Sequence, residues 1–196
     1  IRDTSVTGVQ TCALPILQYT SGTTGDSKFC SFNQSQIDYV SNQLIKFFNL
    51  TENDRYVGVM PLWQGHGLSF YWITEKLNCQ RNFLPVKNIT SAHTYDPTFL
   101  TGIPHMLKVL LRDNFRDLRF IRSGGAPLPS ELYQGLREKF QVPVLESCGF
   151  TESCNIGFCN IPGQEVPGSI GQPLGIEARV SRSEEHTSEL QSPMYL

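Results

Sequence analysis

The sequence predicts an α/β fold in which a parallel-rich sheet is flanked by helices. Short apolar runs alternate along the chain with segments whose apolar residues recur at helical spacing. Loops rich in glycine, proline and hydroxyl residues follow several of these runs. Strands separated by helices pair in parallel and carry helices on both faces. In such sheets ligands bind at the carboxyl ends of the strands, where these loops lie.

The first half of the pattern begins with a helix that Asn33 caps. Its apolar residues follow at helical spacing, namely Ile37, Val40, Leu44 and Phe47 or Phe48. A strand over 55–60 and an aromatic-rich helix over 67–77 come next. Two short strands, 82–86 and 98–102, complete this half.

The second half repeats the alternation. Strand 98–102 leads through Ile103 and Pro104 into a helix over 105–112. A strand over 118–122, a helix over 130–140 and a strand over 142–146 follow. All of these elements fit one domain of ordinary size, because 100–200 residues is a typical domain length.

The two ends of the chain resemble translated sequencing-adapter DNA. Residues 6–16 (VTGVQTCALPI) and 182–192 (RSEEHTSELQS) correspond to the two strands of one adapter. We therefore leave 1–16 and 182–196 out of the fold prediction and assign the domain to 17–181. A secretory leader is the alternative for the first segment, but Asp3 and the polar residues after it do not fit one. The prediction is a cytoplasmic protein.

Composition narrows the function classes. Lys and Arg total 16 and Asp and Glu total 18, a balance that argues against a nucleic-acid-binding or anionic-membrane-binding surface. No apolar run approaches the roughly 20 residues of a transmembrane helix. None of the five cysteines within 17–181 forms a Cys-x-x-Cys pair, so reduced thiols are expected and zinc is not.

Residues 17–28 (LQYTSGTTGDSK) concentrate hydroxyl groups, glycines and one lysine in a single loop. Glycine lets backbone N–H groups turn toward an anion, hydroxyls donate hydrogen bonds, and Lys28 supplies positive charge. The spacing differs from a Walker A loop because Asp26 and Ser27 follow Gly25. Composition alone would favour an ordinary solvated turn.

This loop resembles the signature loop of the adenylate-forming enzymes, which include acyl-CoA synthetases, luciferases and the adenylation domains of peptide synthetases. Ser27 and Phe29 depart from the usual Gly-x-Pro-Lys-Gly ending. The resemblance implies an α/β fold and a phosphate site for ATP. That site would comprise Thr20, Ser21, Gly22, Thr23, Thr24, Gly25 and Lys28.

A second loop, 123–128 (SGGAPL), follows the expected strand 118–122. Two glycines after a strand let a flat group approach the main chain, although a tight strand-to-helix connection would look the same. In the resembled family this loop borders the adenine and the acyl pocket. The residues implied are Gly124, Gly125, Ala126 and Pro127.

A third loop, 146–152 (ESCGFTE), resembles the family's Tyr-Gly-x-Thr-Glu segment. The resemblance gives Thr151 a contact to the phosphate or acyl carboxylate and gives Glu152 a share in holding magnesium. Cys148, next to Gly149, stands where the family usually has a tyrosine that packs on the adenine. Without the other loops, Glu152 would be read as a solvated carboxylate at a helix start.

Residues 61–68 (PLWQGHGL) resemble the family's Pro-Leu-Phe-His stretch, which lines the acyl pocket. The implied pocket residues are Trp63, Gln64, His66 and Gly124. Gln64 replaces the usual histidine, and His66 could either substitute for it or be structural. Residues 167–173 (PGSIGQP) resemble the segment that begins the family's next subdomain.

Taken together, the resemblance implies an incomplete N-terminal domain of an adenylate-forming enzyme. The parent reaction would activate a small carboxylic acid with ATP and Mg²⁺ to an acyl-adenylate and pass the acyl group to coenzyme A. The family's ribose-binding aspartate, hinge and C-terminal lysine fall beyond Ser181, so residues 17–181 alone are expected to be inactive.

Two alternatives for the function stay open at this point. One is an adenylation domain that loads a carrier protein. The other is a nucleotide-binding protein without catalysis, which the departures at Ser27, Gln64 and Cys148 motivate. A chain that lacks strands of its sheet could also fail to fold by itself.

Overall fold

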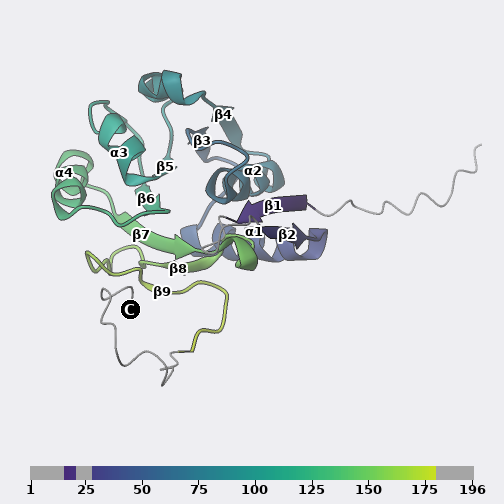
Figure 1. Cartoon of the computed structure of the whole chain (residues 1–196). Helices are drawn as coiled ribbons and strands as arrows, with labels where there is room; N and C mark the ends of the chain where they lie inside the picture. The colour runs from purple at the N-terminus through teal and green to yellow at the C-terminus, as the bar shows by residue number, and fades with distance from the viewer. Residues whose placement is uncertain (1–15, 21–27, 180–196) are drawn as a thin grey trace, which may run out of the picture.

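A seven-stranded sheet forms the centre of the computed structural model, which describes residues 16–20 and 28–179. Its strands lie in the order β4-β3-β5-β6-β7-β8-β9 (Figure 1). Their bounds are β3 Arg55–Gly58, β4 Gln80–Phe83, β5 Phe99–Gly102, β6 Phe120–Gly124, β7 Val144–Gly149, β8 Gly157–Cys159 and β9 Gln172–Pro173.

The five strands from β4 to β7 pair in parallel, which confirms the expected parallel-rich sheet. The last two strands, β8 and β9, run antiparallel at one edge. The sequence pattern did not reveal them because each has only two or three residues. All the parallel strands end on the same side, so the loops that follow β6 and β7 are neighbours.

Helices cover both faces of the sheet. The α-helices are α1 Gln34–Phe48, α2 Gly65–Leu77, α3 Pro104–Leu110 and α4 Ser130–Phe140. One core joins α1 and α2 to the sheet through aromatic rings, with Tyr56 stacked on Phe99 and Phe99 on Phe120. The other core packs α3, α4 and the 3-10 segment η1 (Val86–Tyr95) against Ile121 and Val144 on the opposite face (Figure 1).

An antiparallel hairpin of β1 (Ile16–Thr20) and β2 (Lys28–Phe32) forms a separate two-stranded sheet beside α1. The alternation Leu17, Tyr19 exposed and Gln18 buried shows that one face of β1 points inward. Phe32, at the end of β2, is buried in the α1 core. The sequence pattern gave only an apolar lead-in at this position, so the hairpin is a finding of the structure.

The expected helix starts and strand ends are confirmed with small shifts. Asn33 caps α1 as expected, accepting from the Gln36 amide at 3.0 Å, while Gln36 Oε1 accepts from the Asn33 amide. Strand β6 extends two residues beyond the expected end, through Gly124, because the polar residues there are buried and paired to β5 and β7. The 3-10 segment after β4 was not predicted.

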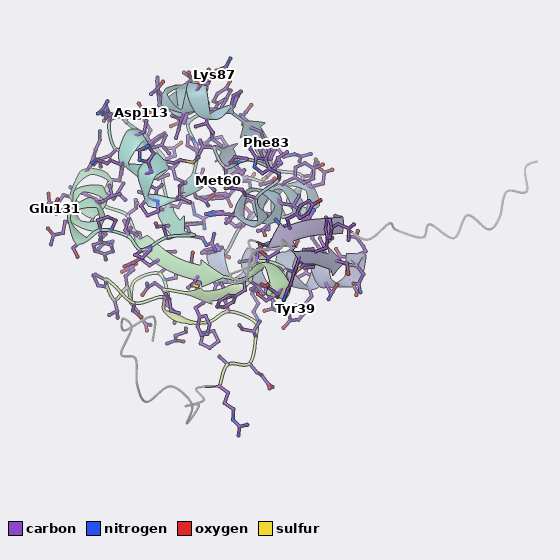
Figure 2. All side chains as sticks on the ribbon, in the orientation of Figure 1. Tyr39, Met60, Phe83, Lys87, Asp113 and Glu131 are labelled. Carbon is purple, nitrogen blue, oxygen red and sulfur yellow. The ribbon has the colours of Figure 1, made fainter. Side chains whose placement is uncertain are left out.

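Figure 2 shows Met60 inside the fold and Lys87 and Glu131 at its periphery. Within residues 16–20 and 28–179, none of the helices combines the length and apolar character needed to cross a membrane. The cysteines in these ranges, Cys30, Cys79, Cys148, Cys154 and Cys159, carry free thiols.

Candidate active site

A cavity of about 310 Å³ opens at the carboxyl ends of β6 and β7. Two loops singled out in the sequence line it together, since β6 and β7 are parallel neighbours. They contribute Gly125, Ala126 and Pro127 from one side and Cys148 and Gly149 from the other. The walls therefore consist largely of exposed backbone and small side chains, which leaves room for a flat ligand.

The segment 166–171 closes the third side of this cavity. The buried carboxylate of Glu146 accepts a hydrogen bond from the Gly168 amide at 2.7 Å. Asn160, the residue after β8, holds the same segment by accepting from the Val166 amide at 2.9 Å and donating to the Ser169 carbonyl at 2.6 Å. The PGSIGQP stretch thus packs against the main sheet and completes the wall.

Glycine is required for a different structural reason at Gly124, the last residue of β6, than at Gly125, which follows it. Gly125 has a φ of +80°, a conformation that side-chain-bearing residues rarely adopt. A Cβ on Gly124 would lie 2.8 Å from Ser147 Oγ, so the close packing of β6 on β7 excludes a side chain there. Gly124 therefore allows the end of β6 to pack closely on β7, and it does not line the cavity itself.

His66, in the first turn of α2, has a partner that the sequence did not reveal. Nη1 of Arg122, on β6, lies 3.0 Å from His66 Nε2. Burial, and then the nearby Arg122 charge, hold the pKa of the imidazole well below its usual range. His66 is therefore neutral at pH 7 and accepts the hydrogen bond. By contrast, Trp63 is 80% exposed and Gln64 is exposed, and both precede the helix.

Asn155 joins three parts of the chain that the sequence analysis treated separately. Its Nδ2 donates to Gln18 Oε1 on β1 at 3.1 Å, which ties the hairpin to the turn after β7. A Cβ on Gly65 would overlap the Asn155 carboxamide, so the start of α2 also packs on this residue. A single asparagine in a loop carries no motif, and sequence reasoning missed it.

The family model of the AMP-binding enzymes matches residues 9–192. The chain belongs to the AMP-binding enzyme family. The match includes parts of both end segments that were predicted to be adapter sequence, and of these parts the structure describes Ile16, the first residue of β1.

Relatives in the AMP-binding family are coenzyme A ligases. The chain is 32% identical to sulfoacetate--CoA ligase of Cupriavidus necator, covering 84% of this chain and 35% of that protein. It is 30% identical to oxalate--CoA ligase of Arabidopsis thaliana, covering 89% and 37%. The structure of O-succinylbenzoate coenzyme A synthetase from Bacillus subtilis in complex with ATP and magnesium ion matches with 29% identity and a TM-score of 0.71, covering 81% and 35%.

The chain thus spans little more than a third of the length of these AMP-binding relatives. The likeness covers 81% of this chain and confirms the N-terminal domain fold of adenylate-forming enzymes.

The predicted ATP-phosphate loop of this AMP-binding chain is described only at its ends. Thr20 and Lys28 are the final pair of the hairpin, so the two strands bring the loop ends together. Ser21, Gly22, Thr23, Thr24 and Gly25 lie outside the described residues. Asn155 ties β1 to the turn after β7, so β1 lies beside the Thr151 turn.

Thr151 and Glu152 form the short turn η2 (Thr151–Ser153), directly after the cavity wall. Glu152 is exposed and borders a second cavity, of about 390 Å³, together with Tyr39 of α1. Figure 2 labels Tyr39. The residues that the structure describes hold no group of three His, Cys, Asp or Glu side chains suited to a metal ion. One exposed carboxylate nevertheless fits magnesium that is held mainly by substrate phosphates.

Proposed function

We propose that the chain is part of an enzyme that activates a carboxylic acid with ATP to an acyl-adenylate and transfers the acyl group to coenzyme A. The observation that carries this proposal is the cavity at the ends of β6 and β7, lined by the two loops expected to hold the adenine. Membership of the AMP-binding family supports the same reaction class. The activity, substrates and partners of the whole protein are part of this proposal.

In this proposal the adenine occupies the cavity between Ala126 and Cys148. Backbone groups at Gly125 and Gly149 border the ring, and the absence of side chains there lets it lie close to the main chain. The phosphates extend toward the hairpin, where Lys28 and residues 20–25 offset their charge. Thr151 donates a hydrogen bond to the α-phosphate or the acid.

Magnesium, when bound with ATP, would be held by Glu152 and would neutralise phosphate charge. The protein's own contribution is positional and electrostatic. It aligns the acid carboxylate with the α-phosphorus and stabilises the charge that builds up as pyrophosphate leaves. ATP consumption favours the cytoplasmic location predicted from the sequence.

The acid would lie on the α2 side of Gly124, bordered by His66, Gln64 and Trp63. The names of the three relatives reported above contain acids with a second ionised group: a sulfonate in sulfoacetate and a second carboxylate in oxalate and succinylbenzoate. Another relative is named for 3-hydroxybenzoate, which has a single carboxylate, so the family alone does not select the acid.

Two alternatives share the nucleotide site. A carrier protein could replace coenzyme A as the acceptor. A binding-only protein is favoured by the exposed Gln64 in place of the usual histidine and by Cys148 in place of the usual tyrosine. Both alternatives keep the cavity and differ in the chemistry that follows binding.

ATP–pyrophosphate exchange separates these possibilities. The natural gene product, amplified and sequenced across both ends without adapter ligation, would be assayed with a panel of small acids. Acid-dependent exchange is the expected result, followed by thioester formation with coenzyme A. ATP binding without exchange for any acid would replace the ligase proposal by the binding-only protein, and exchange with transfer only to a carrier protein would change the acceptor.

A further inference from the structure

Arg122 is a buried cation in the middle of β6. Its residue is only 8% exposed, although arginine is among the residues least often buried. It directly precedes Ser123, which lines the proposed adenine cavity, although Arg122 itself is not among the lining residues. A buried charge of this kind is stabilised either by an anionic side chain of the protein or by an anionic ligand.

The partners of this guanidinium are neutral. Nη1 bonds His66, whose lowered pKa keeps the ring uncharged, and the charge lies 5.5 Å from the centre of the Phe70 ring. Cys159 lies near the guanidinium, and burial raises the pKa of its thiol to about 11, so it is not a thiolate at pH 7. These contacts orient the guanidinium without neutralising it.

Among the described residues, no carboxylate forms an ion pair with Arg122, and its Nε has no hydrogen-bond partner. The buried Glu146 is committed elsewhere, because its Oε1 accepts from the Gly168 amide. A buried charge without a counter-charge is costly, and such charges are normally paired. Arg122 therefore has unused capacity to bind an anion.

The unpaired guanidinium of Arg122 lies at a defined place in the fold, near Gly124 and His66. A Cβ on Gly124 would lie 3.8 Å from Arg122 Nη1, so the guanidinium reaches the carboxyl end of β6. His66 brings the first turn of α2 to the same place. The unpaired cation thus lies next to both segments proposed to border the acid, and the lining of the adenine cavity includes neither Arg122 nor Gly124.

We propose that Arg122 recognises a second anionic group, a carboxylate or sulfonate, on the acid substrate. This inference rests on the proposed function. A planar guanidinium suits a carboxylate or sulfonate because its N–H groups can donate to two oxygens at once. The hydrogen bond to His66 holds the guanidinium on one side, and the guanidinium lies over the Phe70 ring. Acids with one carboxylate lack the group that neutralises the charge and bind more weakly.

The test is acid binding to the purified chain, with and without AMP. Matched pairs of acids serve as probes: malonate with acetate, succinate with butyrate, and phthalate with benzoate. At least one dicarboxylate should bind about tenfold more tightly than its partner. Arg122→Gln should reduce that preference to below about twofold, and Arg122→Lys should keep only part of it. Arg137→Gln, which removes an arginine from α4, should leave it unchanged.

A second readout needs no variant. The Nε–Hε resonance of Arg122 in the wild-type chain should shift when the preferred dicarboxylate is added and stay in place with its monocarboxylate partner. A wild-type chain without any dicarboxylate preference, or a preference that Arg122→Gln leaves intact, would overturn the inference. Failure of AMP to bind while the preference persists would instead count against the nucleotide site alone.

Discussion

Nδ2 of Asn155 donates a hydrogen bond to Oε1 of Gln18 across 3.1 Å, although 137 residues separate the two positions. Gln18 is buried, so the bond is shielded from water. It fixes the hairpin, whose far end carries the proposed phosphate loop, against the turn that carries Thr151 and Glu152. The proposed nucleotide-binding geometry therefore depends on a contact that no motif predicts.

Asn155→Ala should destabilise the fold by about 1–2 kcal/mol, because it leaves the Gln18 oxygen buried without its donor. It should also weaken ATP binding more than AMP binding, since the displaced hairpin serves the outer phosphates. Urea unfolding and calorimetric titration measure the two effects. In a double-mutant cycle with Gln18→Ala the losses should fall short of the sum, and full additivity would show that the bond carries no energy.

Gly149 and Gly102 offer a matched pair, because each is the last residue of a parallel strand. A Cβ on Gly149 would lie 2.6 Å from the Asn155 carbonyl oxygen, whereas the nearest atom to a Cβ on Gly102 is 3.6 Å away. Gly149→Ala should therefore cost about 1–3 kcal/mol of stability and Gly102→Ala less than about 0.5. Equal melting temperatures for the two variants would contradict this packing.

Much of this architecture could be predicted from the sequence, and the limits have physical causes. Helical periodicity and the Asn33 cap gave α1, because both signals are local. The two loops that line the cavity were recognisable because they resemble segments of a known family, whereas their glycines alone would also fit an ordinary turn. Arg122 and Asn155 were not, since their importance arises from packing between segments far apart in the chain. The sequence also did not predict the hairpin or the antiparallel strands at the sheet edge, because these strands are short and their apolar and polar residues do not alternate.

His66 predicts a pH dependence of stability. Its pKa is lowered in the folded protein, so between that pKa and the ordinary value near 6.5 the unfolded chain binds more protons. Stability is therefore fully present above pH 6.5 and falls with acidification, by up to about 1.4 kcal/mol per pH unit. His66→Gln removes this contribution, and its stability should fall less steeply below pH 6.5 than that of the wild type.

Urea unfolding at several pH values between about 7.5 and 5 measures this difference. The matched control is His105→Gln, at an exposed position. It should retain the wild-type slope. A His66→Gln variant as acid-sensitive as the wild type would show that the imidazole is already solvated in the folded state.

Cys148 replaces the family's usual tyrosine and lines the proposed adenine cavity. Cys148→Tyr should supply a stacking surface and tighten AMP binding about fivefold, which corresponds to about 1 kcal/mol. Cys148→Ala, which adds no ring, should change the dissociation constant less than about twofold. Calorimetric titration measures both, and weaker binding by the tyrosine variant would indicate that the cavity is filled by something other than adenine.

The proposed nucleotide site at the ends of β6 and β7 can be tested by the amide chemical shifts of the isotope-labelled chain during titration with AMP. Binding there should give saturable shifts at Gly125, Ala126, Cys148 and Gly149 and none at β4, the opposite edge of the parallel strands. A titration that leaves those four amides in place, or that shifts residues of β4 instead, would contradict it.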